Sequence, residues 1–233
     1  MRGVAVGLTL CCTATAASAE GVLSARYTEE TTRYAHGILG DAIEFGTLVM
    51  ETAAGDVTVT LPQTHVFEDV APRLVDIDAD GAFEVLVVES SITEGARVAI
   101  YDGTGTVKAA TPHIGQSNRW YSPVGVADLD GDGHVEVAYV DRPHLAKTLR
   151  IWRYDDGAFD EVAAAGGVTN HRIGERDIAG GVRDCGEGPE MVLASGNWAQ
   201  LLAVAFNGDF AVTVIGDDTS RPAFAAAMDC DGS

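Results

Sequence analysis

The sequence predicts an all-β fold, a β-propeller of about four four-stranded blades, from three observations. Dipeptides typical of tight turns recur about every fifty residues, strand-like runs flank each of them, and two copies of one acidic loop begin at Asp76 and Asp128. A period of this length that holds four short strands is typical of propeller blades, in which each repeat forms one small antiparallel sheet.

The turn dipeptides divide the chain into similar periods. Asn-Gly and Asp-Gly pairs are strong signals for β-hairpins, and the turns predicted here are Gly55-Asp56, Asp102-Gly103, Asp156-Gly157 and Asn207-Gly208. We expect one strand before each turn and one after it. The strands before the turns are residues 47–51, 97–101, 149–154 and 201–206, and those after them are residues 57–61, 107–110, 159–163 and 210–215.

A short apolar segment in each period leads into a loop that begins with aspartate. The first two loops are followed by residues 85–88 and 137–140, which are continuous apolar runs typical of buried strands. Each loop therefore joins two strands, unlike an EF-hand loop, which lies between helices and ends on a glutamate. The apolar segments that lead into the loops are residues 74–75, 124–127, 181–182 and 225–228.

The two acidic loops carry carboxylates at alternate positions, a glycine at the turn and a later glutamate. Such a set of oxygen ligands suits Ca²⁺, and without a cation the crowded carboxylates would repel one another. We therefore predict two structural Ca²⁺ sites. Their side-chain ligands would be Asp76, Asp78, Asp80 and Glu84 in one loop and Asp128, Asp130, Asp132 and Glu136 in the other, with the carbonyl groups of Ala82 and His134 completing them.

The third and fourth loops, which begin at Asp184 and Asp229, lack the full series of carboxylates. The run Gly-Val-Ala-Asp-Leu-Asp-Gly-Asp-Gly-His-Val-Glu-Val-Ala-Tyr at residues 125–139 resembles the FG-GAP/VCBS repeat of integrin-α-type propellers, here of an exported bacterial type. The resemblance implies a propeller in which the calcium loop joins the innermost strand of a blade to the second strand.

This strand order implies a way to close the ring. Residues 34–61 would supply three strands that lack an innermost partner, and residues 223–228 would form an innermost strand without a second one. We therefore expect residues 223–228 to pair with the N-terminal blade, because closure removes exposed sheet edges. The alternatives are an extra blade between Glu20 and Gly46 and an incomplete ring that oligomerises.

The N-terminal residues 1–19 are typical of a signal peptide, with Arg2 before an apolar run and Ala17-Ser-Ala19 as the cleavage site. We expect cleavage after Ala19, a periplasmic or secreted protein, and a single propeller domain over residues 20–233. An exported compartment permits a disulfide between Cys185 and Cys230, which directly follow the first aspartates of their loops; two buried thiols are the alternative.

The chain is strongly acidic, with 15 lysine and arginine residues against 35 aspartate and glutamate residues and a net charge of −20. This balance argues against nucleic acid and anionic membrane surfaces as partners. Neither the apolar run of the predicted signal peptide nor any later stretch reaches the length that spans a membrane.

The loops opposite the calcium loops form the expected ligand face. Arginine pairs with carboxylates and phosphates, and aromatic rings stack on ligands, although the same residues could brace adjacent blades instead. No H-E-x-x-H or G-x-S-x-G motif is present, so we assign no catalytic residue. The candidate ligand-binding residues are Arg119, Trp120, His144, Lys147, His171, Arg172 and Trp198.

These observations favour a calcium-binding interaction module with an unknown protein or glycan partner. A lyase or hydrolase acting on an anionic sugar or phosphate is the alternative, and a single polar pocket that joins Arg119, His144 and His171 would favour it. A structural subunit of an envelope assembly is a third class, which a large apolar patch on one rim would favour.

Overall fold

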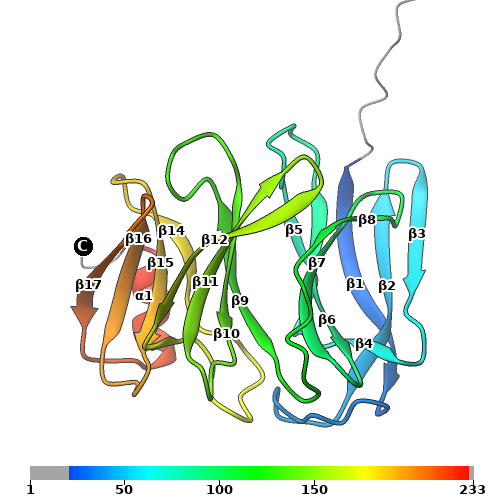
Figure 1. The fold of residues 1–233 in the computed structure, drawn as a ribbon, viewed down its shortest axis with the longest axis horizontal. Coiled ribbons are helices and arrows are strands. Elements are labelled where there is room, and N and C mark those ends of the chain that lie inside the picture. Colours follow the sequence, from blue (N-terminus) through cyan, green and yellow to red (C-terminus); the bar gives the residue numbers. More distant parts are fainter. Residues whose placement is uncertain (1–20, 231–233) are drawn as a thin grey trace, which may run out of the picture.

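The computed structural model describes residues 21–230, which contain 17 β-strands and one helix. All strand pairs are antiparallel, and they form three sheets of eight, four and five strands. The sheets lie one after another along the long axis of the molecule (Figure 1). The predicted signal peptide, residues 1–19, lies outside the described residues.

The eight-stranded sheet contains two units that the short strand β4 joins. Phe45 of β2 pairs with Phe67 of β4, which itself pairs with Glu89 of β6. Unit 1 consists of β1 (Val22–Thr31), β2 (Glu44–Thr52) and β3 (Gly55–Thr60), β4 is His65–Phe67, and unit 2 consists of β5 (Arg73–Val75), β6 (Glu84–Ser91), β7 (Gly95–Tyr101) and β8 (Val107–Ala110).

The other two sheets form one unit each, and a helix follows the last strand. Unit 3 consists of β9 (Tyr121–Ala127), β10 (Glu136–Asp141), β11 (Thr148–Asp155) and β12 (Ala158–Gly166). Unit 4 consists of β14 (Gly181–Asp184), β15 (Pro189–Ser195), β16 (Leu201–Phe206) and β17 (Phe210–Gly216). The short strand β13 (Val168–Thr169) pairs with β15 along the same edge as β14, and α1 (Arg221–Met228) follows β17.

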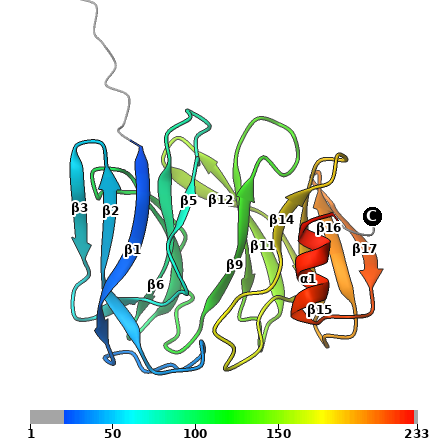
Figure 2. The ribbon, with the colours of Figure 1, turned by 180° about the vertical axis from the view of Figure 1, so that it is seen from behind.

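The predicted hairpins and loop-flanking strands are confirmed. Antiparallel pairs meet at three of the predicted turns, namely β7 with β8, β11 with β12 and β16 with β17. Strands β2 and β3 also form a hairpin, but its turn is Ala53-Ala54, and the predicted pair Gly55-Asp56 begins β3. Strands β5, β9 and β14 pair with the strands that follow their aspartate loops. The first strands of the units, β1, β5, β9 and β14, follow one another along the molecule in Figure 2.

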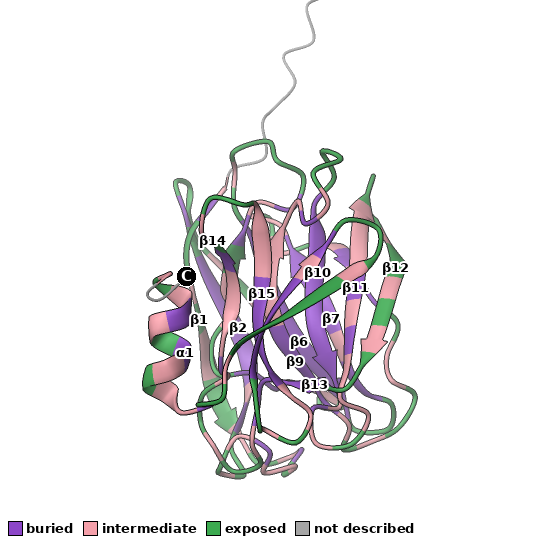
Figure 3. Cartoon of the chain, turned by 90° about the vertical axis from the view of Figure 1, so that its left-hand side faces the viewer, coloured by how far each residue is buried: buried purple, intermediate pink, exposed green. Residues whose placement is uncertain are grey.

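The hydrophobic core lies between successive units. One cluster joins units 1 and 2 around Leu48 and Val87, a second joins units 2 and 3 around Ile100 and Tyr139, and a third joins units 3 and 4 around Ile151. Strands β6 and β10 are buried along their whole length because neighbours cover both of their faces. Figure 3 shows these buried strands in the middle of the molecule.

The prediction that residues 223–228 close a ring is wrong. These residues belong to α1, which packs on β14 and β15 through Phe224 and Ala227 and pairs with no strand (Figure 2). The N-terminal unit already has its own first strand, β1, and residues 34–61 hold two strands, β2 and β3, instead of the three predicted. Local sequence explains the helix: Ser220 accepts a hydrogen bond from the backbone N–H of Ala223 as the N-cap, proline occupies the first turn, and alanine has the highest helix propensity.

The connection between β1 and β2, residues 32–43, reaches unit 4 at the lower end of Figure 1. The backbone N–H of Gly174 donates to the carbonyl group of Ile38 over 3.1 Å, and Arg176 forms an ion pair with Asp41 over 2.7 Å. Gly40 has a φ of +94°, and a Cβ atom there would lie 2.7 Å from the carbonyl oxygen of Gly174. This close approach requires glycine and brings the loops of distant units together.

No helix within residues 21–230 has both the length and the apolar character needed to cross a membrane.

Candidate functional site

The loop between β5 and β6 holds its carboxylates in a fixed turn. The backbone N–H groups of Asp80 and Gly81 donate to the two carboxylate oxygens of Asp76, each over 3.1 Å, and the N–H of Ile77 donates to Glu84 over 3.2 Å. Asp76, Asp78 and Glu84 each offer one oxygen within 4.8 Å of the others. The turn thus gathers three acidic side chains at one point.

The loop between β9 and β10 repeats this arrangement. Asp128 accepts hydrogen bonds from the N–H groups of Gly131 and Gly133, over 2.8 and 3.0 Å, and Glu136 accepts one from Leu129 over 2.9 Å. Oxygens of Asp128, Asp130 and Glu136 also lie within 4.8 Å of one another. The two loops have the same local geometry because they have the same spacing of aspartate and glycine.

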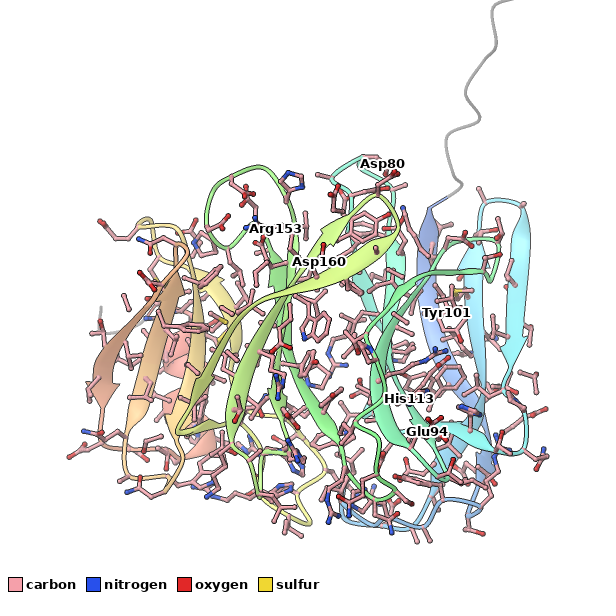
Figure 4. All side chains as sticks on the ribbon, in the orientation of Figure 1. Asp80, Glu94, Tyr101, His113, Arg153 and Asp160 are labelled. Carbon is pink, nitrogen blue, oxygen red and sulfur yellow. A yellow bond between two sulfur atoms is a disulfide. The ribbon has the colours of Figure 1, made fainter. Side chains whose placement is uncertain are left out.

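The third aspartate of each predicted ligand set is oriented differently. Asp80 accepts a hydrogen bond from the N–H of Ala82 over 2.8 Å, and Asp132 accepts one from His134 over 2.9 Å. Neither belongs to the group of converging oxygens in its loop. Figure 4 shows Asp80 at the upper end of the molecule, with Arg153 below the tip of the neighbouring loop.

Basic side chains from other strands contact both acidic groups. The ammonium group of Lys108, on β8, lies 2.5 Å from Asp78 and 2.6 Å from Glu84. The guanidinium group of Arg153 lies 2.5 Å from Asp130, 2.9 Å from Asp132 and 2.7 Å from Glu136. Each acidic group is therefore arranged around a positive charge.

Burial acts against the charged form of the two glutamates. It raises the pKa of Glu84, an effect that the hydrogen bond from Lys108 opposes, and it raises the pKa of Glu136, where Arg153 opposes it. Burial lowers the pKa of Lys108, but its hydrogen bonds to Asp78 and Glu84 outweigh this and raise the pKa above its usual range. Lys108 therefore remains a cation at neutral pH.

The donor set fits a hard divalent cation, since it consists of carboxylate oxygens on a tight loop. The contacts of Lys108 and Arg153 show that each acidic group binds a positive charge. A metal ion would have to compete with these side chains. The sequence does not predict the two basic residues, because they occupy different places in the repeat. Lys108 lies on the fourth strand of unit 2, and Arg153 lies on the third strand of unit 3.

The loop between β14 and β15 has a similar turn at its aspartate and also contains one cysteine of a disulfide. Asp184 accepts hydrogen bonds from the N–H groups of Gly186 and Gly188, over 2.7 and 3.1 Å. Cys185 and Cys230 form a disulfide with a Cα–Cα distance of 5.7 Å, which confirms the predicted pairing. The bridge holds the end of α1 to the β14–β15 loop.

The opposite end of the molecule holds a pocket of about 200 Å³ where loops from several units meet. In Figure 4 the labelled residues Glu94 and His113 lie toward this end. Three of the predicted ligand-binding residues, Arg119, Trp120 and His144, line the pocket. The complete lining is His36, Ile38, Asn118, Arg119, Trp120, Arg142, Pro143, His144, Leu145 and Ile173.

The other predicted ligand residues have structural contacts. Lys147 donates to the carbonyl group of Gly196 over 2.5 Å. The guanidinium group of Arg172 lies 3.7 Å from the ring centroid of Trp198, and Arg172 also donates to Thr219 over 3.2 Å. These contacts stabilise unit 4 and the segment before α1. They agree with the alternative prediction that such residues have a structural role.

Two pairs of titratable residues lie at and behind the pocket wall. His171 is buried, and its Nε2 donates to the carbonyl group of Glu175 over 2.8 Å, so its Nδ1 accepts from His144 Nε2 over 3.0 Å. His36 Nδ1 lies 2.6 Å from a carboxylate oxygen of the buried Glu68. The His36–Glu68 pair was not predicted, because its members are 32 positions apart with no motif linking them.

The protein is all-β and consists of successive antiparallel units with matching acidic loops between paired strands. This arrangement is consistent with a β-propeller of the FG-GAP class. Residues 76–139 match the family model of the FG-GAP-like repeat. The matched segment begins at the first aspartate of one acidic loop and ends within β10, after the second, and it supports the predicted resemblance to the FG-GAP family. The comparison with curated proteins finds no match.

Proposed function

We propose that this chain is an exported interaction module of the FG-GAP/VCBS type, a single propeller domain over residues 20–233 that two structural Ca²⁺ ions stabilise. The observation that carries the proposal is the pair of matching carboxylate groups, each on a loop between the first two strands of a unit. Each loop connects two paired strands of its unit, so an ion there would hold the strands in place without taking part in chemistry.

Calcium is the ion proposed because the ligands are oxygens from aspartate and glutamate, and Ca²⁺ accepts such ligands in varied number and geometry. Asp76, Asp78 and Glu84 would supply the first group and Asp128, Asp130 and Glu136 the second. Asp80, Asp132 and the carbonyl groups of Ala82 and His134 would complete the two sets. Lys108 and Arg153 would supply positive charge when the ion is absent.

Export is proposed from two features. Residues 1–19 have the composition of a signal peptide. The Cys185–Cys230 disulfide suits an oxidising compartment such as a periplasm or the extracellular space. The partner is a protein or a glycan whose identity the sequence leaves open.

The enzyme alternative rests on the pocket, which brings Arg119 and His144 together with His36. Recognition of an anionic sugar or a phosphate needs several polar contacts around the ligand. Half of the lining residues are apolar, namely Ile38, Trp120, Pro143, Leu145 and Ile173. The lining therefore fits binding of a partly apolar ligand better than it fits a lyase or hydrolase of this kind.

Thermal unfolding in Ca²⁺ and in EDTA tests the calcium proposal. A free Ca²⁺ concentration ten times the dissociation constant is expected to add about 1.4 kcal/mol to the free energy of unfolding for each site, because the ion binds only the folded loops. The melting temperature in Ca²⁺ should exceed that in EDTA, and Mg²⁺ at the same concentration serves as the control. Equal melting temperatures in Ca²⁺ and EDTA would contradict the proposal.

A further inference from the structure

The pocket at the end opposite the acidic loops is apolar at its mouth. It lies between the β1–β2 connection, the segment before β9, the β10–β11 loop and the segment after β13. Leu145 and Ile173 line it and are 65% and 69% exposed, although both are large apolar side chains. Trp120 forms part of the wall and is fixed by a hydrogen bond from its Nε1 to the carbonyl group of Glu68, over 2.7 Å.

Arg119 gives the pocket one positive charge that no acid within residues 21–230 compensates. Its guanidinium group donates to the carbonyl group of Asn118 over 2.7 Å and forms no ion pair in that part of the chain. The other arginine of the lining, Arg142, is bound by both carboxylate oxygens of Asp141 over 2.7 and 3.0 Å. Arg150 contacts Asp141 and Glu161, so those four charges cancel.

The two histidines of the lining add no further uncompensated positive charge. Burial, together with the neighbouring His171, lowers the pKa of His144 to about 4, so its ring is neutral at neutral pH. Any positive charge on His36 would be compensated by the carboxyl group of Glu68, which lies 2.6 Å from its Nδ1. In a protein with a net charge of −20, the pocket thus keeps a single positive charge beside an apolar wall.

We infer that this pocket binds a small monocarboxylate with an apolar body, its carboxylate on Arg119 and its body against Trp120, Leu145 and Ile173. Arginine is suited to a carboxylate because its planar fork can donate two parallel hydrogen bonds. An inorganic anion would leave the apolar wall exposed to water, and a neutral apolar molecule would leave Arg119 without an anionic partner. The inference is independent of calcium in the acidic loops at the other end.

Benzoate is the probe that tests this inference, with binding followed by NMR of the methyl groups of Leu145 and Ile173. We expect saturable shifts of both methyl signals with a dissociation constant on the order of 1 mM. Benzyl alcohol, which lacks the charge, and inorganic phosphate, which lacks the apolar body, should each bind at least about tenfold more weakly, a difference of about 1.4 kcal/mol.

Two variants and a control locate the ligand. Arg119→Gln removes the charge and should weaken benzoate binding about tenfold. Leu145→Asp places a negative charge at the exposed mouth of the pocket and should also weaken it. Arg26→Gln, on β1, removes an exposed arginine whose partner is Asp56 and should leave binding unchanged. Unchanged binding in both pocket variants, equal binding of phosphate, or the absence of methyl shifts would overturn the inference.

Discussion

Replacing Arg153 by methionine is expected to lower the free energy of unfolding by about 2–3 kcal/mol in EDTA, and Ca²⁺ is expected to restore most of that loss. Breaking a buried ion pair from one side costs about 3–5 kcal/mol, because the remaining charge has no partner. Here Glu136 is fully buried, but the Arg153 side chain is 25% exposed, so water reduces the cost. Urea unfolding of the wild type and the variant, each in EDTA and in Ca²⁺, measures the effect.

Arg150→Met is the matched control for this experiment. Arg150 lies on the same strand and contacts the buried Asp141 over 2.9 Å, so its loss should also destabilise the fold. Asp141 is not part of either acidic group. Ca²⁺ should therefore reduce the difference in free energy of unfolding between Arg153→Met and the wild type, and it should leave the difference between Arg150→Met and the wild type unchanged. Equal rescue of both variants, or of neither, would contradict the proposed metal site in the β9–β10 loop.

Removal of the disulfide in a Cys185→Ser, Cys230→Ser double variant is expected to lower the free energy of unfolding by about 3–4 kcal/mol. The bond joins residues 45 positions apart, and this constraint on the unfolded chain is lost in the variant. Denaturant unfolding measures the change, and reduction of the wild type should give a similar value. A variant as stable as the oxidised wild type would show that the bridge contributes nothing.

The α1 helix should survive the loss of the bridge, because other contacts hold it. Ser220 caps its first turn, and Arg183, paired with Glu190, donates to the carbonyl group of Ala227. Phe224 remains buried against β14 and β15. The helical signal in circular dichroism should therefore change little in the double variant, and its loss would assign the disulfide a role in forming the helix.

Local signals predicted the strands well and the C-terminal element wrongly. The turns at Asp102-Gly103 and Asn207-Gly208 are set by residues next to each other, so pattern alone located the hairpins. The place of residues 223–228 in the repeat predicts a strand. The cap at Ser220 and the alanines after it favour a helix, and these local preferences prevailed over the repeat.

The candidate sites were predictable only where their residues are close in sequence. The acidic loops lie within nine positions each, whereas Arg153 reaches Glu136 because the two residues pair across β10 and β11. The pairing of these two strands is set by the fold, so the spacing of the two residues in the sequence does not predict their contact. The pocket depends in the same way on how loops from different units pack together. This packing places Arg119 in the lining, whereas Lys147 contacts Gly196 instead.

Calorimetric titration of the metal-free protein with Ca²⁺ tests most directly whether the acidic loops are calcium sites. The structure predicts two bound ions for the wild type, one for each carboxylate group, and one ion for either Asp76→Asn or Asp128→Asn. A titration of the wild type without heat of binding would contradict this account, because it would mean that Lys108 and Arg153 alone neutralise the loops.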